Sequence, residues 1–449
     1  MFKVWHFLAS MKTRTWFAIV AAISVIERVV LYLSYRPVLY NDTSGYRHTA
    51  AAILKGWKNL NGTRTPGYPA FLALFGPDER VYIAQLTLGL ATTLLFFYLG
   101  WRVSQKGWFG ALVALVHTLN LGQLFFEANL ISESLTTFLI VASLAWIAWL
   151  VYSDTRRLQW RVVFAGLAGG LTAGLVTLTR PLFIFLPFWV ALFLLAFWKA
   201  AQPKIRWSSA LAAGLSGLLI VGAWVNFIHQ HFGIWSLSVM NGYNLVQHTG
   251  LFFEYVPDEY AAIRDTYIQF RDERITEMGV PGNAIWDAIP QLEQASGLGF
   301  IPLSNLLAKI SIHLILQHPD LYLRNVLIGW LWFWKAPVYW SSASVANPAL
   351  RDIISVSIMI ERGGMVLFNI AFIFGSLTLV WKKMRQALKM DRFVWFTLGV
   401  IWFTSIIQTL LDHGDNPRFS VPIQTLVLFI VLWWLTSLIN RNKYEDHPA

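Results

Sequence analysis

The chain has 449 residues, of which 56% are hydrophobic and only 13% are charged, and its mean hydropathy is +0.52. Because soluble domains carry about 25% charged residues, this composition excludes a soluble globular protein and indicates an integral membrane protein. The net charge of +11 is explained by Lys and Arg in cytoplasmic loops rather than by nucleic-acid binding. The sequence contains no cysteine, which excludes disulfides and thiolate metal sites.

Hydrophobic segments long enough to cross a bilayer recur along the whole chain. The first follows a basic N-terminal stretch, and we expect it to be retained as a spanning helix rather than cleaved as a signal peptide. The sequence predicts an all-α polytopic membrane protein of about ten transmembrane helices. The predicted spans lie near residues 15–35, 81–101, 108–126, 131–152, 161–179, 181–199, 207–228, 353–381, 393–411 and 418–440.

Three parts follow from this pattern of spans. We expect an N-terminal transmembrane module over 1–228, which carries the first external loop at 36–80. A larger helical external domain covers 229–352, and a C-terminal transmembrane module with a cytoplasmic tail covers 353–449.

The charge of the loops predicts the orientation of the spans. Short basic loops alternate with loops that contain the candidate functional residues, and the segment WKKMRQALKMDR at 381–392 is the most basic. Basic loops face the cytoplasm, so we expect both termini inside and the active side of the protein outside. This parity requires that 311–340 does not cross once, which predicts an interfacial helix or a re-entrant hairpin there. A crossing pair of short helices would satisfy the parity equally well.

The first external loop concentrates polar residues directly after the first span. Residues 44–57 have apolar side chains at helical spacing, which predicts a helix lying in the membrane interface. Asp42 before it is either a helix N-cap or a general base. Arg64 either extends to lipid headgroups or binds a specific phosphate, and TPGYP, which contains Tyr68, is a stiff turn before the second span.

Further candidates lie in the other loops of the same side. Arg180 occupies a tight bend between two spans and needs an anionic partner, from the protein or from a ligand. Glu133 begins the fourth span and either caps it or reaches the same pocket as Asp42. His248 lies in the large external loop, and the segment DHGDNPRFSVP contains Asp415 and Arg418. The spacing of the histidines matches no metal-binding motif.

Four segments together resemble a known group of enzymes. They are RTPGYPAFLALFG, NLISESLTTFLIVASLAWIAWL, GLAGGLTAGLVTLTRPLFIFLP and NPRFSVPIQTLVLFI. They resemble the polyprenyl-phosphate-sugar-dependent glycosyltransferases of the GT-C superfamily, in particular the protein mannosyltransferases and the lipid A aminoarabinose transferases (glycosyltransferase family 39-like). The resemblance covers most of 1–200 and the last spans, but not 229–352.

The resemblance implies a GT-C-like bundle and an inverting transfer of a sugar from a polyprenyl-phosphate carrier to a lipid, glycan or protein acceptor. It implies that the reaction takes place at the external face of a cell membrane, and two sequons in the first loop favour the bacterial cytoplasmic membrane. Asp42 takes the place of the catalytic base. The expected substrate-binding residues are Arg64, Tyr68, Glu133, Arg180, His248, Asp415 and Arg418.

One departure from the family concerns a metal ion. Many members have Asp-Glu in the first loop, whereas this chain has Asn41-Asp42-Thr43. The missing second carboxylate leaves a requirement for a divalent metal open, with Glu133 as its obvious substitute. No cofactor is otherwise implied.

Two other functions remain as alternatives. An O-antigen polymerase or ligase would use Arg and His residues of the large external loop. A transporter or flippase for lipid-linked glycans would have charged residues within its spans and repeated halves. Glu27 and Arg28 form the only clear intramembrane pair, and no internal repeat is visible. The acidic first loop favours the glycosyltransferase.

Overall fold

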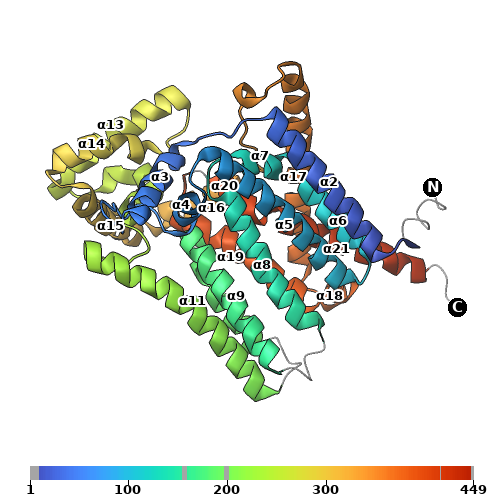
Figure 1. Ribbon diagram of the computed structural model, residues 1–449. Helices are drawn as coiled ribbons and strands as arrows, with labels where there is room; N and C mark the ends of the chain where they lie inside the picture. Colours follow the sequence, from blue (N-terminus) through green and yellow to red (C-terminus); the bar gives the residue numbers. More distant parts are fainter. Residues whose placement is uncertain (1–9, 154–158, 197–201, 415, 446–449) are drawn as a thin grey trace. The chain divides into compact units, whose positions relative to one another are not determined.

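The computed structural model describes residues 10–153, 159–196, 202–414 and 416–445. These residues are almost entirely helical (Figure 1). Outside helices, the described part of the chain has only two isolated β-bridges, Tyr35–Val345 and Val38–Asn129. The expected all-α polytopic fold is confirmed.

The chain divides into two compact units, which we describe separately. The first unit takes in 1–224, 336–402 and 421–449. Its helices are α2 (Thr13–Ser34), α3 (Asn41–Leu54), α4 (Gly67–Phe75), α5 (Asp78–Ser104), α6 (Gly107–Thr118), α7 (Leu121–Ala128), α8 (Glu133–Tyr152), α9 (Gln159–Thr179), η1 (Pro181–Phe185), α10 (Leu186–Ala196), most of α11 (Pro203–Phe232), η4 (Ser342–Ser344), α17 (Ala349–Thr378), α18 (Lys382–Ala387), the first half of α19 (Arg392–Leu411) and α21 (Val421–Glu445).

The second unit takes in 225–335 and 403–420. Besides the ends of α11 and α19, it contains α12 (Asn241–Thr249), η2 (Gly250–Tyr255), η3 (Asp258–Tyr260), α13 (Ala261–Met278), α14 (Ala284–Ser296), α15 (Phe300–Gln317), α16 (Pro319–Phe333) and α20 (Asn416–Phe419). Its core is built from apolar side chains of α12 to α15, among them the fully buried Tyr243, Phe253, Ile285 and Leu307.

Nine helices of the described residues are long and apolar enough to cross a membrane, and the bent pair α6–α7 brings the number to ten if it is one span. The number of candidate spans therefore agrees with the expected ten if the bent pair is counted, but the helices that make up this number differ from those expected. Residues 181–196, predicted as part of a span, form the turn η1 and the short helix α10. Conversely, α15 passes the test of length and hydropathy although we predicted a polar external segment around it.

The predicted span at 108–126 is broken because Asn120 begins a new helix. The side chain of Asn120 accepts a hydrogen bond from the Gln123 backbone at 2.9 Å, the usual action of an N-cap. The Glu361 carboxylate of α17 accepts hydrogen bonds from the first two amides of α7, those of Leu121 at 2.8 Å and Gly122 at 3.1 Å. The two helices meet at 55°. All three amides therefore have acceptors, which allows a break between two apolar helices.

The segment 311–340 contains the second part of α15 and all of α16, so it is a pair of helices and not a single interfacial helix, and whether the pair enters or crosses the membrane stays a prediction. α15 ends at Gln317 and α16 starts at Pro319, so His318 joins them. Proline at the first position of α16 fits the start of a helix and cannot continue the previous one.

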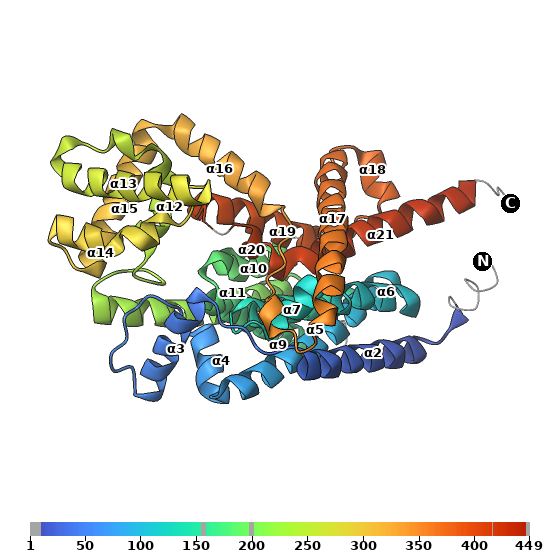
Figure 2. The same ribbon diagram turned by 90° about the horizontal axis from the view of Figure 1, so that it is seen from above.

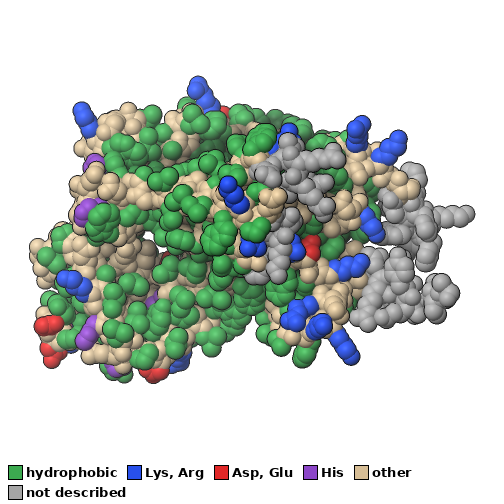
Figure 3. Space-filling view, turned by 90° about the horizontal axis from the view of Figure 1, so that it is seen from below, with side chains coloured by type: hydrophobic (Ala, Val, Ile, Leu, Met, Phe, Trp, Pro, Cys, Tyr) green, Lys and Arg blue, Asp and Glu red, His purple; other side chains and the backbone are tan. Residues whose placement is uncertain are grey.

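In the first unit α5 packs against α6 and α8, α8 packs against α9, and α2 lies along α5 and α6 (Figures 1 and 2). Small residues allow close approach: a Cβ added to Gly100 of α5 would lie 3.0 Å from the Cα of Gly110 in α6. Apolar side chains cover much of the molecular surface, as Figure 3 shows for one face. A surface of this kind suits contact with lipid and supports a multi-pass membrane protein.

The intramembrane charges pair differently from our expectation. Arg28 forms an ion pair with Glu127 of α7 at 2.6 Å, not with its neighbour Glu27, and both partners are buried. Glu27 instead accepts a hydrogen bond from Thr118 at 2.7 Å. Gly89 of α5 makes room for the pair, because a Cβ there would overlap the Glu127 carboxylate.

Candidate active site

The first loop is held against the segment that joins α7 to α8. The Val38 amide donates to the Ala128 carbonyl at 3.0 Å, and the Leu130 amide donates to the Val38 carbonyl at 2.9 Å. The Thr43 hydroxyl donates to the Leu130 carbonyl at 2.9 Å. These bonds place the start of α3 beside the start of α8, although the two are far apart in the sequence.

Asp42 lies in the first turn of α3 and pairs with Arg64. The helix begins at Asn41 with Tyr40 as its N-cap, so the interpretation of Asp42 as the N-cap was wrong. Arg64 Nη2 lies 2.7 Å from Asp42 Oδ1, and the two side chains are 27% and 20% exposed. Gly45 allows this approach, since a Cβ there would lie 2.9 Å from Arg64 Nε. The pair is thus partly open to the surroundings of the protein.

Glu133 and Arg180 form a second, buried ion pair. Arg180 Nη2 lies 2.5 Å from Glu133 Oε1, and the two side chains are 6% and 1% exposed. Arg180 Nε also donates to the Ser132 hydroxyl at 3.3 Å. Glu133 is therefore the anionic partner that the position of Arg180 required.

Tyr46 lies between the two ion pairs. Its ring centre is 5.2 Å from the guanidinium of Arg64, and its hydroxyl donates to Ser132 at 3.2 Å. Burial raises the pKa of the Tyr46 phenol, and the nearby charge of Asp42 raises it further. The phenol therefore stays protonated and acts as a hydrogen-bond donor at neutral pH.

The TPGYP segment at the start of α4 packs against the end of α9 and hydrogen-bonds to α5. A Cβ added to Gly67 would lie 2.7 Å from the Leu178 carbonyl, so only glycine lets α4 approach the end of α9 this closely. The ring of Tyr68 is fully buried, and its hydroxyl donates to Gln85 at 2.7 Å. Gln85 in turn donates to the carbonyls of Glu127 and Asn129 at 2.8 Å. The placement of Tyr68 indicates support of the α7–α8 segment.

The remaining predicted residues belong to the second unit. His248 of α12 is fully buried, and its ring centre is 5.4 Å from that of His413. Burial lowers the pKa of His248 to about 3. Arg418 of α20 lies with its guanidinium 5.7 Å from the Phe419 ring centre, and Asp415 lies outside the described residues. Within the first unit, Asp42, Arg64, Tyr68, Glu133 and Arg180 lie together.

Sequence reasoning missed the residues that join this cluster. Tyr46 follows Asp42 by one helical turn and belongs to the apolar spacing of residues 44–57, which gave no sign of a polar role. Ser132 directly precedes Glu133, and Gln85 lies within a predicted span. The one usable signal was the i, i+4 spacing of Asp42 and Tyr46, which places both on one face.

A divalent metal does not fit these residues. Asp42 and Glu133 each pair with a guanidinium, and the described part of the chain contains no group of three or more His, Asp or Glu side chains arranged to hold a metal ion.

No family model and no curated protein matches the sequence. Among solved structures, the chain is similar to the archaeal oligosaccharyltransferase AglB from Archaeoglobus fulgidus in complex with an inhibitory peptide and a dolichol-phosphate, with 13% identity and a TM-score of 0.51. That alignment covers 97% of this chain and 52% of AglB, so the chain spans about half the length of its relative.

ArnT from Cupriavidus metallidurans also aligns. Its apo structure has 13% identity, a TM-score of 0.38 and coverage of 95% of this chain and 78% of ArnT. The structure bound to undecaprenyl phosphate has 12% identity, a TM-score of 0.33 and coverage of 96% and 78%. The likeness to AglB shows that the chain shares the fold of the aligned part of that protein.

Proposed function

We propose that the chain is an inverting glycosyltransferase that moves a sugar from a polyprenyl-phosphate carrier to an acceptor at the external face of a bacterial cytoplasmic membrane. One observation carries this proposal. The partly exposed Asp42–Arg64 pair lies next to a buried cluster of polar side chains, which are Tyr46, Ser132, Glu133 and Arg180. An accessible carboxylate and an accessible cation are therefore fixed side by side. The shared fold with a dolichol-phosphate-containing oligosaccharyltransferase supports it.

In the proposed reaction Asp42 acts as the general base. A hydroxyl oxygen of the acceptor attacks the anomeric carbon of the sugar, while the Asp42 carboxylate takes the hydroxyl proton. The bond between the anomeric carbon and the phosphate oxygen breaks, and polyprenyl phosphate leaves. A single displacement of this kind inverts the configuration at the anomeric carbon.

Arg64 binds the donor phosphate in this scheme. A guanidinium has five N–H donors, and one nitrogen of Arg64 serves Asp42. The others can donate to phosphate oxygens, on which negative charge grows as the bond to the sugar breaks. One residue would thereby align the leaving group with the base.

Arg180 and Glu133 act as positioning residues. Their side chains are too deeply buried to meet a substrate directly. Arg180 donates a hydrogen bond to the Ser132 hydroxyl, which in turn accepts a hydrogen bond from the Tyr46 hydroxyl. The Tyr46 ring lies against the guanidinium of Arg64, so the buried pair positions Arg64 through Tyr46. Contributions of His248, Asp415 and Arg418 to substrate binding stay predictions.

The test is a mass profile of envelope lipids, glycans and glycoproteins from a host that lacks this chain. The host is complemented with the native chain, with Asp42→Asn, or with Asp78→Asn at equal expression. Asp78 is the matched control because it also pairs with an arginine, Arg47, but at an exposed site. We expect a sugar-sized mass to return with the native chain and with Asp78→Asn.

With Asp42→Asn we expect a loss of turnover of about 10²- to 10⁴-fold, the usual contribution of general-base catalysis. Full restoration by Asp42→Asn would disprove the assignment of the base. No sugar-sized mass with any chain would instead favour a transporter of lipid-linked glycans. The buried Arg28–Glu127 pair is the one observation on the side of that second candidate, because charges inside spans often mark transport paths.

A further inference from the structure

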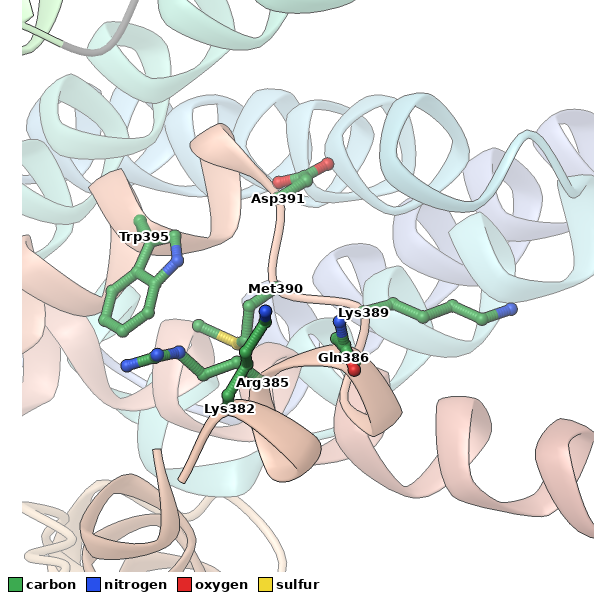
Figure 4. Close-up of a pocket in the computed structure, with 7 residues that line it drawn as sticks. All are labelled: Lys382, Arg385, Gln386, Lys389, Met390, Asp391 and Trp395. Carbon is green, nitrogen blue, oxygen red and sulfur yellow. The ribbon is translucent and has the colours of Figure 1, made fainter. Parts of the chain in front are cut away.

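A second polar feature of the first unit lies far from Asp42. Residues between α17 and α19 form an open pocket of about 560 Å³. Side chains of α18, of the turn after it and of the start of α19 line it (Figure 4). Lys382, Arg385 and Lys389 provide three positive charges, and Trp395 provides an aromatic wall.

The acidic residue at this pocket is used elsewhere. Asp391 accepts a hydrogen bond from the Tyr152 hydroxyl and another from the Val394 amide at 2.8 Å, so it caps the start of α19. Of the described residues that line the pocket, Asp391 is the only acidic one. The three cations are therefore left without a carboxylate of their own among the lining residues.

Hydrogen bonds hold the backbone of the pocket in place. The Trp433 indole donates to the Lys389 carbonyl at 3.3 Å, and the Met390 amide donates to the Arg385 carbonyl at 3.0 Å. Arg385 itself donates to the Leu379 carbonyl at the end of α17 at 3.3 Å. A pocket that is already formed loses little entropy when it binds a ligand.

The helices around the pocket place it at the opposite end of α8 from Glu133. It stands at the end of α17 and the start of α19, which are both candidate spans. Asp391 contacts Tyr152, the last residue of α8, whereas Glu133 is the first. The 20 residues of α8 cover about 30 Å, which is the thickness of the hydrocarbon core.

Apolar side chains stand next to the cations. Val380 and Trp381, just before Lys382, are 76% and 62% exposed. A basic cavity beside exposed apolar residues matches a lipid, whose headgroup is anionic and whose chains are apolar. A free phosphate ion would use the cations only.

We propose that this pocket binds the headgroup phosphate of an anionic membrane lipid. Lys382 and Arg385 neutralise and hydrogen-bond the phosphate, and Lys389, whose side chain extends away from them in Figure 4, adds positive charge beside it. Val380 and Trp381 contact the acyl region. The site is separate from the proposed sugar-transfer site and does not depend on that function.

The experiment is native mass spectrometry of the full chain, released from nanodiscs of phosphatidylcholine with or without phosphatidylglycerol. The variant is Lys382→Gln with Lys389→Gln. The control is Lys383→Gln with Arg392→Gln, which removes the same charge from exposed neighbours that do not line the pocket. Since each lost charge-assisted hydrogen bond to a phosphate in the pocket weakens binding by about tenfold, we expect the variant to lose phosphatidylglycerol adducts by more than about tenfold. The control should lose clearly fewer adducts than the variant, because Lys383 and Arg392 do not line the pocket and their replacement removes only general surface charge.

Equal losses in variant and control would overturn the proposal, since the attraction would then come from the general charge of the loop. Addition of inorganic phosphate separates the two ligand sources. Removal of the lipid adducts by millimolar phosphate would show a site for a free anion and would overturn the assignment to a lipid. Retention of the adducts supports it. Melting of both variants in detergent confirms that each is folded.

Discussion

At the scale of single residues, two arginine–carboxylate ion pairs of similar geometry differ in how deeply their side chains are buried. Arg180–Glu133 is almost inaccessible, whereas Arg47–Asp78 has side chains that are 45% and 44% exposed. Loss of one partner of a buried pair leaves an unpaired charge in an apolar environment, but water solvates the survivor of an exposed pair.

We therefore expect Arg180→Ala to reduce the free energy of unfolding by about 3–5 kcal/mol, and Arg47→Ala by less than about 1 kcal/mol. Unfolding in mixed micelles titrated with SDS measures both. Arg180→Ala combined with Glu133→Ala should cost less than the sum of the single changes. Additive costs would show that the two side chains do not interact.

His248 makes the stability of the second unit depend on pH. Burial lowers its pKa to about 3 and also lowers the pKa of His413, so both rings are neutral in the folded protein. In the unfolded chain a histidine has a pKa of about 6.5. The unfolded state therefore binds more protons below this pH, and stability falls as the pH decreases from about 6.5 toward 3.

Between pH 7 and 5 we expect His248 alone to account for a loss of about 2 kcal/mol. Thermal unfolding midpoints of the native chain, His248→Phe and His231→Phe across this range check it. His248→Phe should show a shallower decrease than the native chain. His231 is exposed, so His231→Phe should behave like the native chain. Parallel curves for all three would contradict the role of His248.

At the scale of elements, a glycine decides how α4 approaches α9. Gly67→Ala would place a methyl group against the Leu178 carbonyl and the Thr179 side chain. We expect it to cost about 1–3 kcal/mol, as overpacking does, and to lower activity because Arg180 directly follows Thr179. In Gly363→Ala of α17 the methyl group meets open space, and stability should be unchanged or higher. Equal stability of the two variants would show that α4 moves freely.

The helices also show for which spans hydropathy alone is a sufficient predictor. Length and apolar composition were enough for long helices such as α5, α8 and α21. They were not enough for α6–α7, because the cap from Glu361 comes from more than 200 residues away. α15 has a mean hydropathy of 1.3 in its most apolar window, below the 1.6 to 2.0 of the other candidate spans, so it was assigned to the polar external segment.

The candidate site was likewise predictable only in part. The sequence marked Asp42, Arg64, Glu133 and Arg180 as unusual charges beside spans, but it did not show which would pair. The pairing depends on the Val38–Asn129 bridge, which is a tertiary contact with no local signal. Tyr46 and Ser132 escaped notice because tyrosine and serine are common at interfaces and helix starts.

At the scale of the whole molecule, the loop charges predict which side of the membrane each surface faces. The chain has no cysteine, so a single introduced thiol can be labelled without background. We expect Lys58→Cys, in the first loop, to react with a membrane-impermeant maleimide in intact cells. Lys383→Cys should react only after permeabilisation. Both positions are exposed, so a reversed pattern would show that the predicted orientation is wrong.

Hydrogen bonds join α17 to other parts of the first unit at two places, one in its middle and one at its end. Glu361 holds the first amides of α7, and the Leu379 carbonyl just after the helix receives Arg385 from the basic pocket. α7 leads directly into the segment that carries Ser132 and Glu133. Because α17 is held at both places, we expect a change in its tilt from the membrane normal to shift α7 and the segment that carries Ser132 and Glu133. For the proposed glycosyltransferase we therefore expect turnover to vary with bilayer thickness even when every residue of the candidate site is native.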